Sequence, residues 1–336
     1  MQSAEARILD RQNPIDRLHG MVAAEMAATD RLIHDRLGSA VPLIPALAQH
    51  LVDSGGKRLR PVLTIAAARL NGYRGVAHTR LAAAVEFIHT ATLLHDDVVD
   101  VSALRRGKIA ANVVWGNKSS VLVGDYLFSR AFQLMVEADD VDVLNVLASA
   151  SAVIAEGEVL QLRSANNLAT TREDYLQVIT AKTAALFAAA AESGAMIAGG
   201  QRGVTEAMRM FGHHLGIAFQ LIDDALDYSG RQAQMGKSIG DDFREAKVTL
   251  PVIVAYERAE EAAKDFWRRT IEDGAPHEGD LKRAIAYVDE TGAIEETQAL
   301  ARYHADKAIT ALNAVPAHDI REALVAVAEF CVDRVY

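Results

Sequence analysis

The sequence has one cysteine, Cys331, among 336 residues, and this scarcity excludes several kinds of site. A single cysteine cannot form an internal disulfide or a metal site built from several thiolates. Such a chain suits a reducing compartment, so we expect it in the cytoplasm. The first residues include Glu5, Arg7 and Asp10 and lack the apolar run of a signal peptide, and we therefore expect no export.

Proline is also rare, with 7 residues and none from position 62 to position 250. Proline in a helix interior costs about 3 kcal/mol, whereas the alanine, leucine and glutamate of this interval are strong helix formers. Apolar residues recur at helical spacing, as at Phe128, Phe132 and Met135. We predict an all-α protein. Because no low-complexity spacer divides it, we expect one domain over residues 1–336, with residues 1–20 as a loose N-terminal segment.

Long uncharged apolar runs and excess positive charge are both missing. The segment 184–198 is interrupted by Glu192, and a membrane span needs about 18 apolar residues, so we expect no span. The 35 Lys and Arg residues against 45 Asp and Glu residues give a net charge of −10. A sequence-independent nucleic-acid binder needs a strongly basic face, so we do not expect a nucleic-acid partner.

The last helix has a recognisable start and a buried face. Asp319 followed by Glu322 fits an N-cap with its capping partner. Ile320, Leu324 and Cys331 then fall on one helical face together with two further apolar residues, Val327 and Ala328. We expect this face, including Cys331, to lie in the core.

Two acidic clusters stand inside apolar helical segments, and both have the pattern D-D-x-x-D. In the first, Asp96 and Asp100 are four residues apart; in the second, Asp223 and Asp227 have the same spacing. Residues four apart lie on one face of a helix, about 5–6 Å from each other, so the like charges repel. Unpaired carboxylates among leucine, isoleucine and valine are costly, and we therefore expect a cation between them.

Oxygen ligands without cysteine suit Mg²⁺, which shares one or two carboxylates with a substrate phosphate. Two such clusters suit the binding of a diphosphate. An EF-hand is excluded because neither cluster has the required Asp-x-Asp-x-Asp-Gly loop. A single cluster of this kind would equally fit an exposed acidic helix end; two copies favour the metal site.

Basic residues accompany the acids in an otherwise acidic chain. They include Lys57 and Arg60 before the first cluster, Arg105 and Arg106 after it, and Lys182 before the second. Arginine binds phosphate oxygens through two parallel hydrogen bonds and lysine supplies a point charge, so these side chains suit direct diphosphate binding. Arg58 fits a solvated surface charge equally well, and His89, two turns before Asp96, fits either a phosphate donor or a core histidine.

These motifs together resemble those of the trans-isoprenyl diphosphate synthases, specifically the long-chain polyprenyl branch that makes octaprenyl, solanesyl and decaprenyl diphosphates. The matching segments occur in the family's order from about residue 50 to residue 251. They are Gly-Gly-Lys-Arg-Leu-Arg-Pro at 55–61, Leu-Leu-His-Asp-Asp-Val-Val-Asp at 93–100, Arg105-Arg106-Gly107, Lys182-Thr183, Gln220 with Asp223-Asp224-Ala225-Leu226-Asp227, and Gly236-Lys237.

The resemblance implies a helical bundle of the isoprenoid-synthase type around a deep central cavity, usually in a homodimer. It implies residues that bind isopentenyl diphosphate: Lys57, Arg60, His89 and Arg106. It implies residues that hold the allylic diphosphate, such as farnesyl diphosphate: Arg105, Lys182, Thr183, Gln220 and Lys237. The implied ligands of several Mg²⁺ ions are the motif aspartates Asp96, Asp97, Asp100, Asp223, Asp224 and Asp227, although Asp97 and Asp224 point about 100° away from their neighbours.

The resemblance also implies the reaction, a sequential 1′-4 head-to-tail condensation of isopentenyl diphosphate onto the allylic diphosphate. Asp96, Asp100, Asp223, Lys182 and Lys237 would carry the catalysis. Ala91 and Thr92, about one turn before Asp96, are small where short-chain relatives tend to have an aromatic residue. We therefore expect a long product of eight to ten isoprene units, a precursor of a quinone side chain, with Phe128, Phe132 or Met135 as the tunnel floor. Equally, these three are ordinary core residues at i, i+4 and i+7.

One segment departs from the family pattern. Where the family often has Gly-Lys-x-Thr-Leu-Pro, this chain has Ala246 followed by Lys247 and ends at Pro251. Replacing glycine removes conformational freedom, so we expect a stiffer loop.

Alternative functions are a shorter-chain farnesyl or geranylgeranyl synthase, a class I terpene cyclase, and a non-catalytic subunit that regulates a partner synthase. A cyclase would share the first aspartate cluster but not the second or the 55–61 segment. A regulatory subunit could lose motif acids or basic anchors, and this chain retains them. A purely structural helical protein would have no reason to keep both clusters. A transient contact with a membrane surface would help to release an insoluble product.

Overall fold

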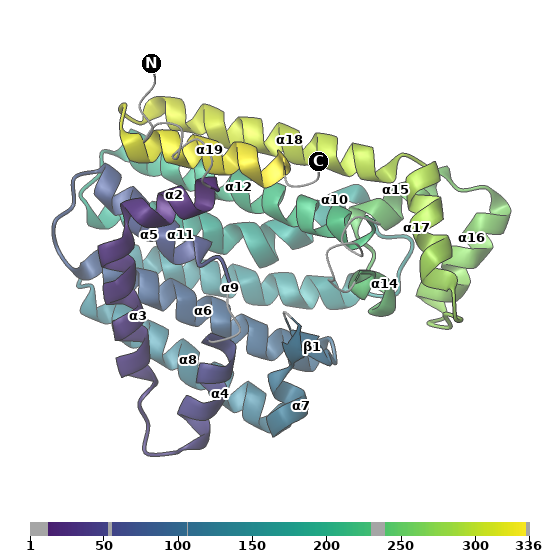
Figure 1. Cartoon of the computed structure of the whole chain (residues 1–336), viewed down its shortest axis with the longest axis horizontal. Coiled ribbons are helices and arrows are strands. Elements are labelled where there is room, and N and C mark those ends of the chain that lie inside the picture. The colour runs from purple at the N-terminus through teal and green to yellow at the C-terminus, as the bar shows by residue number, and fades with distance from the viewer. Residues whose placement is uncertain (1–12, 53–55, 106, 230–238, 334–336) are drawn as a thin grey trace. The chain divides into compact units, whose positions relative to one another are not determined.

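The computed structural model describes residues 13–52, 56–105, 107–229 and 239–333, and these are almost entirely helical (Figure 1). The all-α prediction is confirmed. Contacts divide the chain into two compact units. Unit 1 comprises residues 1–151, 186–212 and 311–327, and unit 2 comprises residues 152–185, 213–310 and 328–336. The prediction of a single domain stays a prediction.

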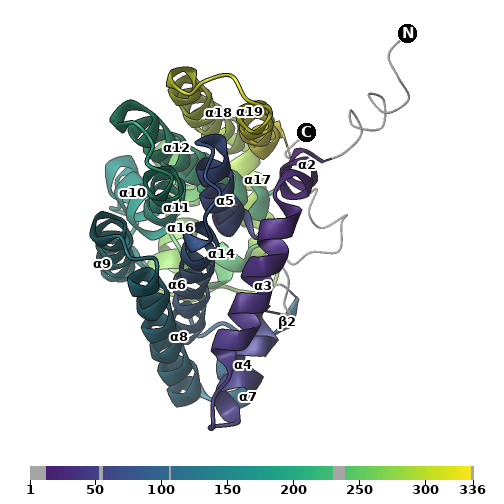
Figure 2. The ribbon, with the colours of Figure 1, turned by 90° about the vertical axis from the view of Figure 1, so that its left-hand side faces the viewer.

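Unit 1 is built around α6, which packs against α3, α5 and, over most of its length, α8 (Figures 1 and 2). The buried residues of α6 include three consecutive alanines, Ala82, Ala83 and Ala84, which are fully buried and allow close packing. The elements that lie wholly in unit 1 are α2 (Pro14–Met21), α3 (Ala23–Leu37), α4 (Leu43–Val52), α5 (Leu59–Leu70), α6 (Ala77–Val99), β1 (Leu104–Arg105), β2 (Lys108–Ile109), α7 (Ala111–Trp115), α8 (Asn117–Glu137) and the 3₁₀ turn η3 (Leu312–Ala314).

Unit 2 has an aromatic core in which the rings of Phe243, Phe266 and Trp267 contact one another. Its helix α15 packs against α10, α16 and α17. The elements that lie wholly in unit 2 are α10 (Arg172–Ile179), the π-helical turn η1 (Thr180–Ala184), α14 (Asp241–Arg244), α15 (Leu250–Arg258), α16 (Glu261–Trp267), the π-helical turn η2 (Arg268–Glu272) and α17 (Asp280–Glu290).

The division into units falls inside helices, so several helices contribute residues to both. These are α9 (Val141–Ser164), α11 (Ala185–Ile197), α12 (Arg202–Asp227), α18 (Ala293–Ala311) and α19 (Asp319–Asp333).

The structure differs from the sequence predictions at several local points. The proline-free interval contains a short antiparallel hairpin in which Arg105 pairs with Lys108, next to Gly107 at φ +75°. The N-terminal segment expected to be loose is helical from Pro14, with Ile15 and Leu18 buried; residues 1–12 lie outside the described residues.

The third difference concerns α19. His318, not Asp319, caps it, because Nδ1 of His318 accepts from the backbone N–H of Ile320 at 3.0 Å. The sequence prediction considered only side chains with a hydroxyl or a carboxylate as N-caps, and so it missed the imidazole of His318. The predicted buried face is confirmed, since Ile320, Leu324, Val327, Ala328 and Cys331 are all buried.

Helix α9 is a further difference, because the sequence analysis expected no segment long and apolar enough to span a membrane. By length and composition it is the kind of helix that can cross a membrane: 24 residues with a mean hydropathy of 1.5 in its best window, of which 28% is buried. A search for uninterrupted runs of apolar residues does not find this helix, because Glu156 and Glu158 divide its apolar sequence. The expectation that the chain crosses no membrane stays a prediction.

Candidate active site

The first aspartate motif lies at the C-terminal end of α6. The backbone N–H of Asp100 donates to the carbonyl of Asp96 at 2.8 Å, so the helical turn continues through the motif. Asp96 and Asp100 are therefore one turn apart on the same face, as the spacing predicts. Asp96 is buried and Asp100 half-buried.

Asp97 has a different environment from its two neighbours. Its side chain is fully buried, and its Oδ1 accepts from Nε of Arg105 on β1 at 2.7 Å. Burial raises the pKa of Asp97, and the guanidinium of Arg105 opposes that rise. The carbonyl of Asp97 also accepts from the amide of Asn112 on α7, at 2.8 Å. Asp97 thus joins α6 to the hairpin and to α7, whereas Asp96 and Asp100 are the candidate metal ligands that share one face of α6.

Two of the predicted isopentenyl diphosphate residues lie together in unit 1. Nη1 of Arg60, on α5, donates to Nε2 of His89, on α6, at 3.2 Å. The same guanidinium stacks 4.3 Å from the ring centre of Phe187, a buried residue of α11 that the sequence analysis missed. A cation over an aromatic face is held by the ring's negative charge distribution, so Phe187 fixes the orientation of Arg60.

The neighbours of Arg60 divide into a structural pair and an exposed cation. Arg58, at φ +44°, binds Glu86 of α6 at 2.6 Å and so fastens the start of α5. Lys57 is exposed, and its carbonyl accepts from the ring of His19 at 2.7 Å. Arg106 lies outside the described residues.

The predicted chain-length residues do not share one environment. Ala91 is fully buried, and Thr92 is half-buried with its hydroxyl donating to the carbonyl of His89. Of the three floor candidates on α8, Met135 is buried, Phe128 stacks on His95, and Phe132 is 44% exposed. Leu127, Ala131 and Leu134 on the same helix are also fully buried. The structure therefore places Phe132 away from the buried face of α8.

The second aspartate motif lies at the C-terminal end of α12, in the part that belongs to unit 2. Asp223 is exposed, whereas Asp224 is buried and accepts two hydrogen bonds. Its Oδ2 accepts from the hydroxyl of Tyr175 at 2.6 Å, and its Oδ1 from the amide of Gln220 at 2.7 Å. Burial raises the pKa of Asp224 to about 6, although both hydrogen bonds oppose this. Burial raises the pKa of Tyr175 well above its ordinary value, so its hydroxyl stays a donor.

Asp227 binds the backbone that follows the motif. Its carboxylate accepts from the N–H groups of Gly240, Asp241 and Asp242 at 2.9–3.2 Å. Burial raises the pKa of Asp227, and these backbone donors oppose the rise. Asp227 therefore fixes the segment that leads into α14, and Asp223 is the motif carboxylate with the most exposure to a ligand.

The predicted lysine and threonine of the allylic site lie on the π-helical turn η1. Thr183 donates to the side-chain oxygen of Gln220 at 2.9 Å, so two residues predicted for the same ligand are in contact. Lys182 binds Glu158 of α9 at 2.7 Å. A Cβ on Gly157 would lie 2.8 Å from Cβ of Ala181, so only glycine permits this close packing of α9 against η1. Lys237 lies outside the described residues.

The donors present fit Mg²⁺ bound together with a phosphate. Within the described ranges, no group of three or more His, Cys, Asp or Glu side chains is arranged as a complete metal site. Mg²⁺ keeps several waters and commonly uses one or two carboxylates plus substrate phosphates, so it does not need such a group. Asp96 with Asp100, and separately Asp223, offer the hard oxygen ligands that this mode of binding requires.

The structure adds three residues that local sequence patterns did not indicate: Tyr175, Glu158 and Phe187. Each contacts a predicted site residue from a different helix. The only sequence signal is weak: Tyr175 precedes Lys182 by seven residues and Phe187 follows Thr183 by four, and both are helical spacings.

Comparison with known proteins gives consistent results. The family model described as polyprenyl synthetase matches residues 41–288. Octaprenyl diphosphate synthase of Escherichia coli K12 is 44% identical over 320 residues, which is 95% of this chain and 99% of the relative. A polyprenyl synthase from Caulobacter crescentus CB15, solved with calcium and isoprenyl diphosphate, is 54% identical with a TM-score of 0.92, covering 95% of this chain and 98% of that one. A decaprenyl diphosphate synthase from Rhodobacter capsulatus has the same identity and TM-score, with 96% and 99% covered.

Proposed function

The chain belongs to the polyprenyl synthetase family and is a prenyltransferase, and from this premise we propose that it is a Mg²⁺-dependent long-chain trans-polyprenyl diphosphate synthase. The observation that carries the proposal is similarity over nearly the whole chain to proteins named for long products, the octaprenyl and decaprenyl diphosphate synthases. The site residues described above supply the groups that such a reaction needs.

In this proposal, unit 2 holds the diphosphate of the allylic substrate. Lys182 supplies a positive charge, and Thr183 and Gln220 supply neutral hydrogen-bonding groups from η1 and α12. When a diphosphate leaves, negative charge develops on its oxygens, and fixed cations and dipoles aimed at those oxygens lower the barrier. Lys237 has the same proposed role, as does Arg105 in unit 1.

Unit 1 would hold isopentenyl diphosphate. Arg60 and His89 lie 3.2 Å apart with Arg60 oriented by Phe187. Lys57, which is exposed, adds further charge, and Arg106 has the same proposed role. A pre-oriented guanidinium binds phosphate through two bonds with little loss of side-chain entropy. These residues would fix the position of the substrate double bond, and placing two reactants is itself a large part of catalysis.

Asp96, Asp100 and Asp223 would hold Mg²⁺, which would supply Lewis-acid stabilisation of the departing diphosphate. In the reaction, the bond between the allylic C1 and oxygen breaks and its electrons leave with the diphosphate. The double bond of isopentenyl diphosphate then attacks C1 through its C4, and the released diphosphate takes the proton lost from C2. No protein nucleophile is required.

We also propose that the chain forms a homodimer. Leu122 and Val136 on α8 are 67% and 64% exposed, and with Phe132 they fall on one side of that helix. Val141, Val159 and Leu162 on α9 are likewise more than half exposed. Exposed apolar side chains that gather on one side of a helix favour an interface, and in this proposal a second copy of the chain covers them.

The test is incubation of the purified protein with farnesyl diphosphate, radiolabelled isopentenyl diphosphate and Mg²⁺. We expect label to be incorporated into long chains, sized by chromatography after dephosphorylation, and EDTA to abolish the incorporation. Products no longer than geranylgeranyl would favour a shorter-chain synthase. No incorporation would favour a regulatory subunit that needs a catalytic partner.

A further inference from the structure

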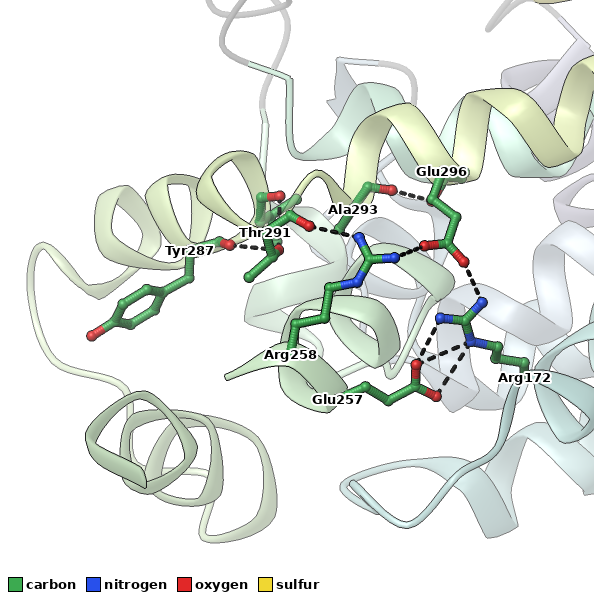
Figure 3. A network of polar contacts seen from close by, with 9 residues as sticks. Arg172, Glu257, Arg258, Tyr287, Thr291, Ala293 and Glu296 are labelled. Carbon is green, nitrogen blue, oxygen red and sulfur yellow. Dashed lines mark hydrogen bonds and ion pairs between the residues drawn. The ribbon is translucent and has the colours of Figure 1, made fainter. Parts of the chain in front are cut away.

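The start of α10 is fixed by a network of charged side chains in unit 2 (Figure 3). Arg172, the first residue of α10, donates to both carboxylate oxygens of Glu257 on α15, at 2.7–3.3 Å. Its other nitrogen binds Glu296 of α18. Glu296 in turn binds Arg258, which donates to the carbonyl of Thr291 at 2.7 Å.

A capping box completes this fixed end. The hydroxyl of Thr171 accepts from the backbone N–H of Asp174 at 3.1 Å, and the carboxylate of Asp174 accepts from the N–H of Thr171 at 3.0 Å. The capping box thus satisfies the backbone N–H groups of Thr171 and Asp174, and the side chain of Arg172 ties the first turn of α10 to α15 and α18. The helix cannot shift along its axis without breaking these contacts.

Tyr175 lies one turn after Arg172, so the contacts of Arg172 also fix the position of Tyr175. Tyr175 in turn contacts the second aspartate motif. Its side chain is 4% exposed, and its hydroxyl donates to Oδ2 of Asp224 at 2.6 Å. Asp224 then orients Gln220, whose oxygen accepts from Thr183. Four side chains, Tyr175, Asp224, Gln220 and Thr183, therefore form one continuous chain of hydrogen bonds.

The π-helical turn η1 makes this chain possible. Tyr175 and Thr183 are eight residues apart, which in a regular α-helix would place them about 80° apart around the axis. A π-helical turn winds more slowly and narrows that angle. Both side chains can therefore reach Asp224 and Gln220, which are one turn apart on α12.

We propose that Tyr175 is a positioning residue for the allylic diphosphate: its hydrogen bond to Asp224 fixes the side chains of Gln220 and Thr183 in the orientation that binds this substrate. The inference rests on the proposed function, since it concerns the same reaction. It assigns no contact between Tyr175 and the substrate. The residues proposed for isopentenyl diphosphate lie in unit 1 and are not part of this hydrogen-bond chain.

The test compares Tyr175→Phe with Tyr228→Phe. Tyr228 is equally buried in the same unit, but its hydroxyl has no hydrogen-bond partner among the residues that the structure describes, so its removal breaks no bond. For Tyr175→Phe we expect the KM of farnesyl diphosphate to rise and its kcat/KM to fall by about tenfold, the usual size for a lost bond to a charged group. The KM of isopentenyl diphosphate should change less than twofold. Tyr228→Phe should resemble the wild type.

Calorimetric titration with farnesyl diphosphate and Mg²⁺ gives a second readout without turnover, and we expect weaker binding by Tyr175→Phe alone. In the background of Asp224→Asn, adding Tyr175→Phe should have little further effect, because the two act through one bond. If Tyr175→Phe does not fold, Asp224→Asn alone should show the same difference between the two KM values.

Equal changes in both KM values, or no change in either, would overturn the positioning role. Failure of the proposed function would give a different result, because the wild-type protein itself would then incorporate no isopentenyl diphosphate.

Discussion

Arg105 donates from Nε to Oδ1 of Asp97 at 2.7 Å, although Asp97 is the second residue of the first aspartate motif. The two adjacent aspartates of this motif therefore have different tasks. Asp96 shares a helix face with Asp100, whereas Asp97 is fully buried and holds the hairpin that carries Arg105. The same division recurs at the second motif, where Asp223 is exposed and Asp224 is held by Tyr175 and Gln220.

This division predicts opposite results for two matched substitutions. Asp96→Asn should lower kcat by at least about a hundredfold, as loss of a group that stabilises developing charge does, and should leave the melting temperature nearly unchanged. Asp97→Asn should instead destabilise the fold by about 1–3 kcal/mol, because it leaves the donors of the partly buried Arg105 without their charged acceptor. Activity assays and thermal melts measure both. A rate loss in Asp97→Asn equal to that of Asp96→Asn, without a change in melting, would show that Asp97 is itself a metal ligand.

Product length provides the second prediction. Ala91 is fully buried one turn before the first motif, so Ala91→Phe should shorten the product, at a cost in stability of about 1–3 kcal/mol from overpacking. Phe132→Ala is the control. Phe132 is 44% exposed, so we expect the product of this variant to keep its length. Chromatography of dephosphorylated products decides both: an unchanged length in Ala91→Phe would remove Ala91 from the tunnel, and a longer product from Phe132→Ala would make Phe132 the floor.

The sequence was sufficient to predict how site residues on the same helix lie relative to one another. A four-residue spacing on a helix was sufficient to place Asp96 beside Asp100, and the reaction class followed from the motifs in combination. The contacts between Asp97 and Arg105, Lys182 and Glu158, or Tyr175 and Asp224 join different elements. Such pairs depend on how the elements pack, and no local period encodes them. The π-helical turn η1, which shifts the phase of the residues after it, was not predictable from composition for the same reason.

The exposed apolar face of α8 predicts an effect on assembly. Replacing Leu122 and Val136 together with glutamate places two charges on that face and should convert a dimer into a monomer, as measured by light scattering after size-exclusion chromatography. The control is Val76→Glu, since Val76 is similarly exposed at 63% but precedes α6. A double variant that still elutes as a dimer would place the interface elsewhere.

Ala246 predicts a gain in stability at the position where the family often has glycine. Its φ is +49°, in the left-handed region that costs a residue with a Cβ about 1–2 kcal/mol. Ala246→Gly removes this strain and adds some entropy to the unfolded chain, so we expect a net gain of roughly 0.5–1 kcal/mol.

Thermal melting measures the effect of Ala246→Gly, and Ala299→Gly is the control. Ala299 is exposed in the middle of α18, where glycine should cost about 1 kcal/mol. If both variants lose stability, the left-handed conformation of Ala246 is not strained.

The histidine pair between α12 and α18 predicts how stability depends on pH. Nδ1 of His214 lies 3.0 Å from Nδ1 of His304, so one ring donates and the other must be unprotonated at that nitrogen. Burial lowers the pKa of His214 to about 4, with His213, His304 and Lys307 adding to the effect. Burial likewise lowers the pKa of His304 to about 4, with His213 as the second cause.

In the unfolded chain, both rings bind a proton near pH 6.5. Between about pH 6.5 and pH 4 the unfolded state therefore binds more protons than the folded state, and stability falls as the pH is lowered through this window. Each of the two protons changes the free energy of unfolding by at most about 1.4 kcal/mol per pH unit. The actual change is smaller because both rings keep some contact with solvent. Melting temperatures of the wild type should thus be clearly lower at pH 5 than at pH 7.5. Replacing His214 and His304 together with leucine should reduce that difference, whereas His34→Gln, on the exposed side of α3, should not. An equal pH response in all three proteins would assign the acid sensitivity to other groups.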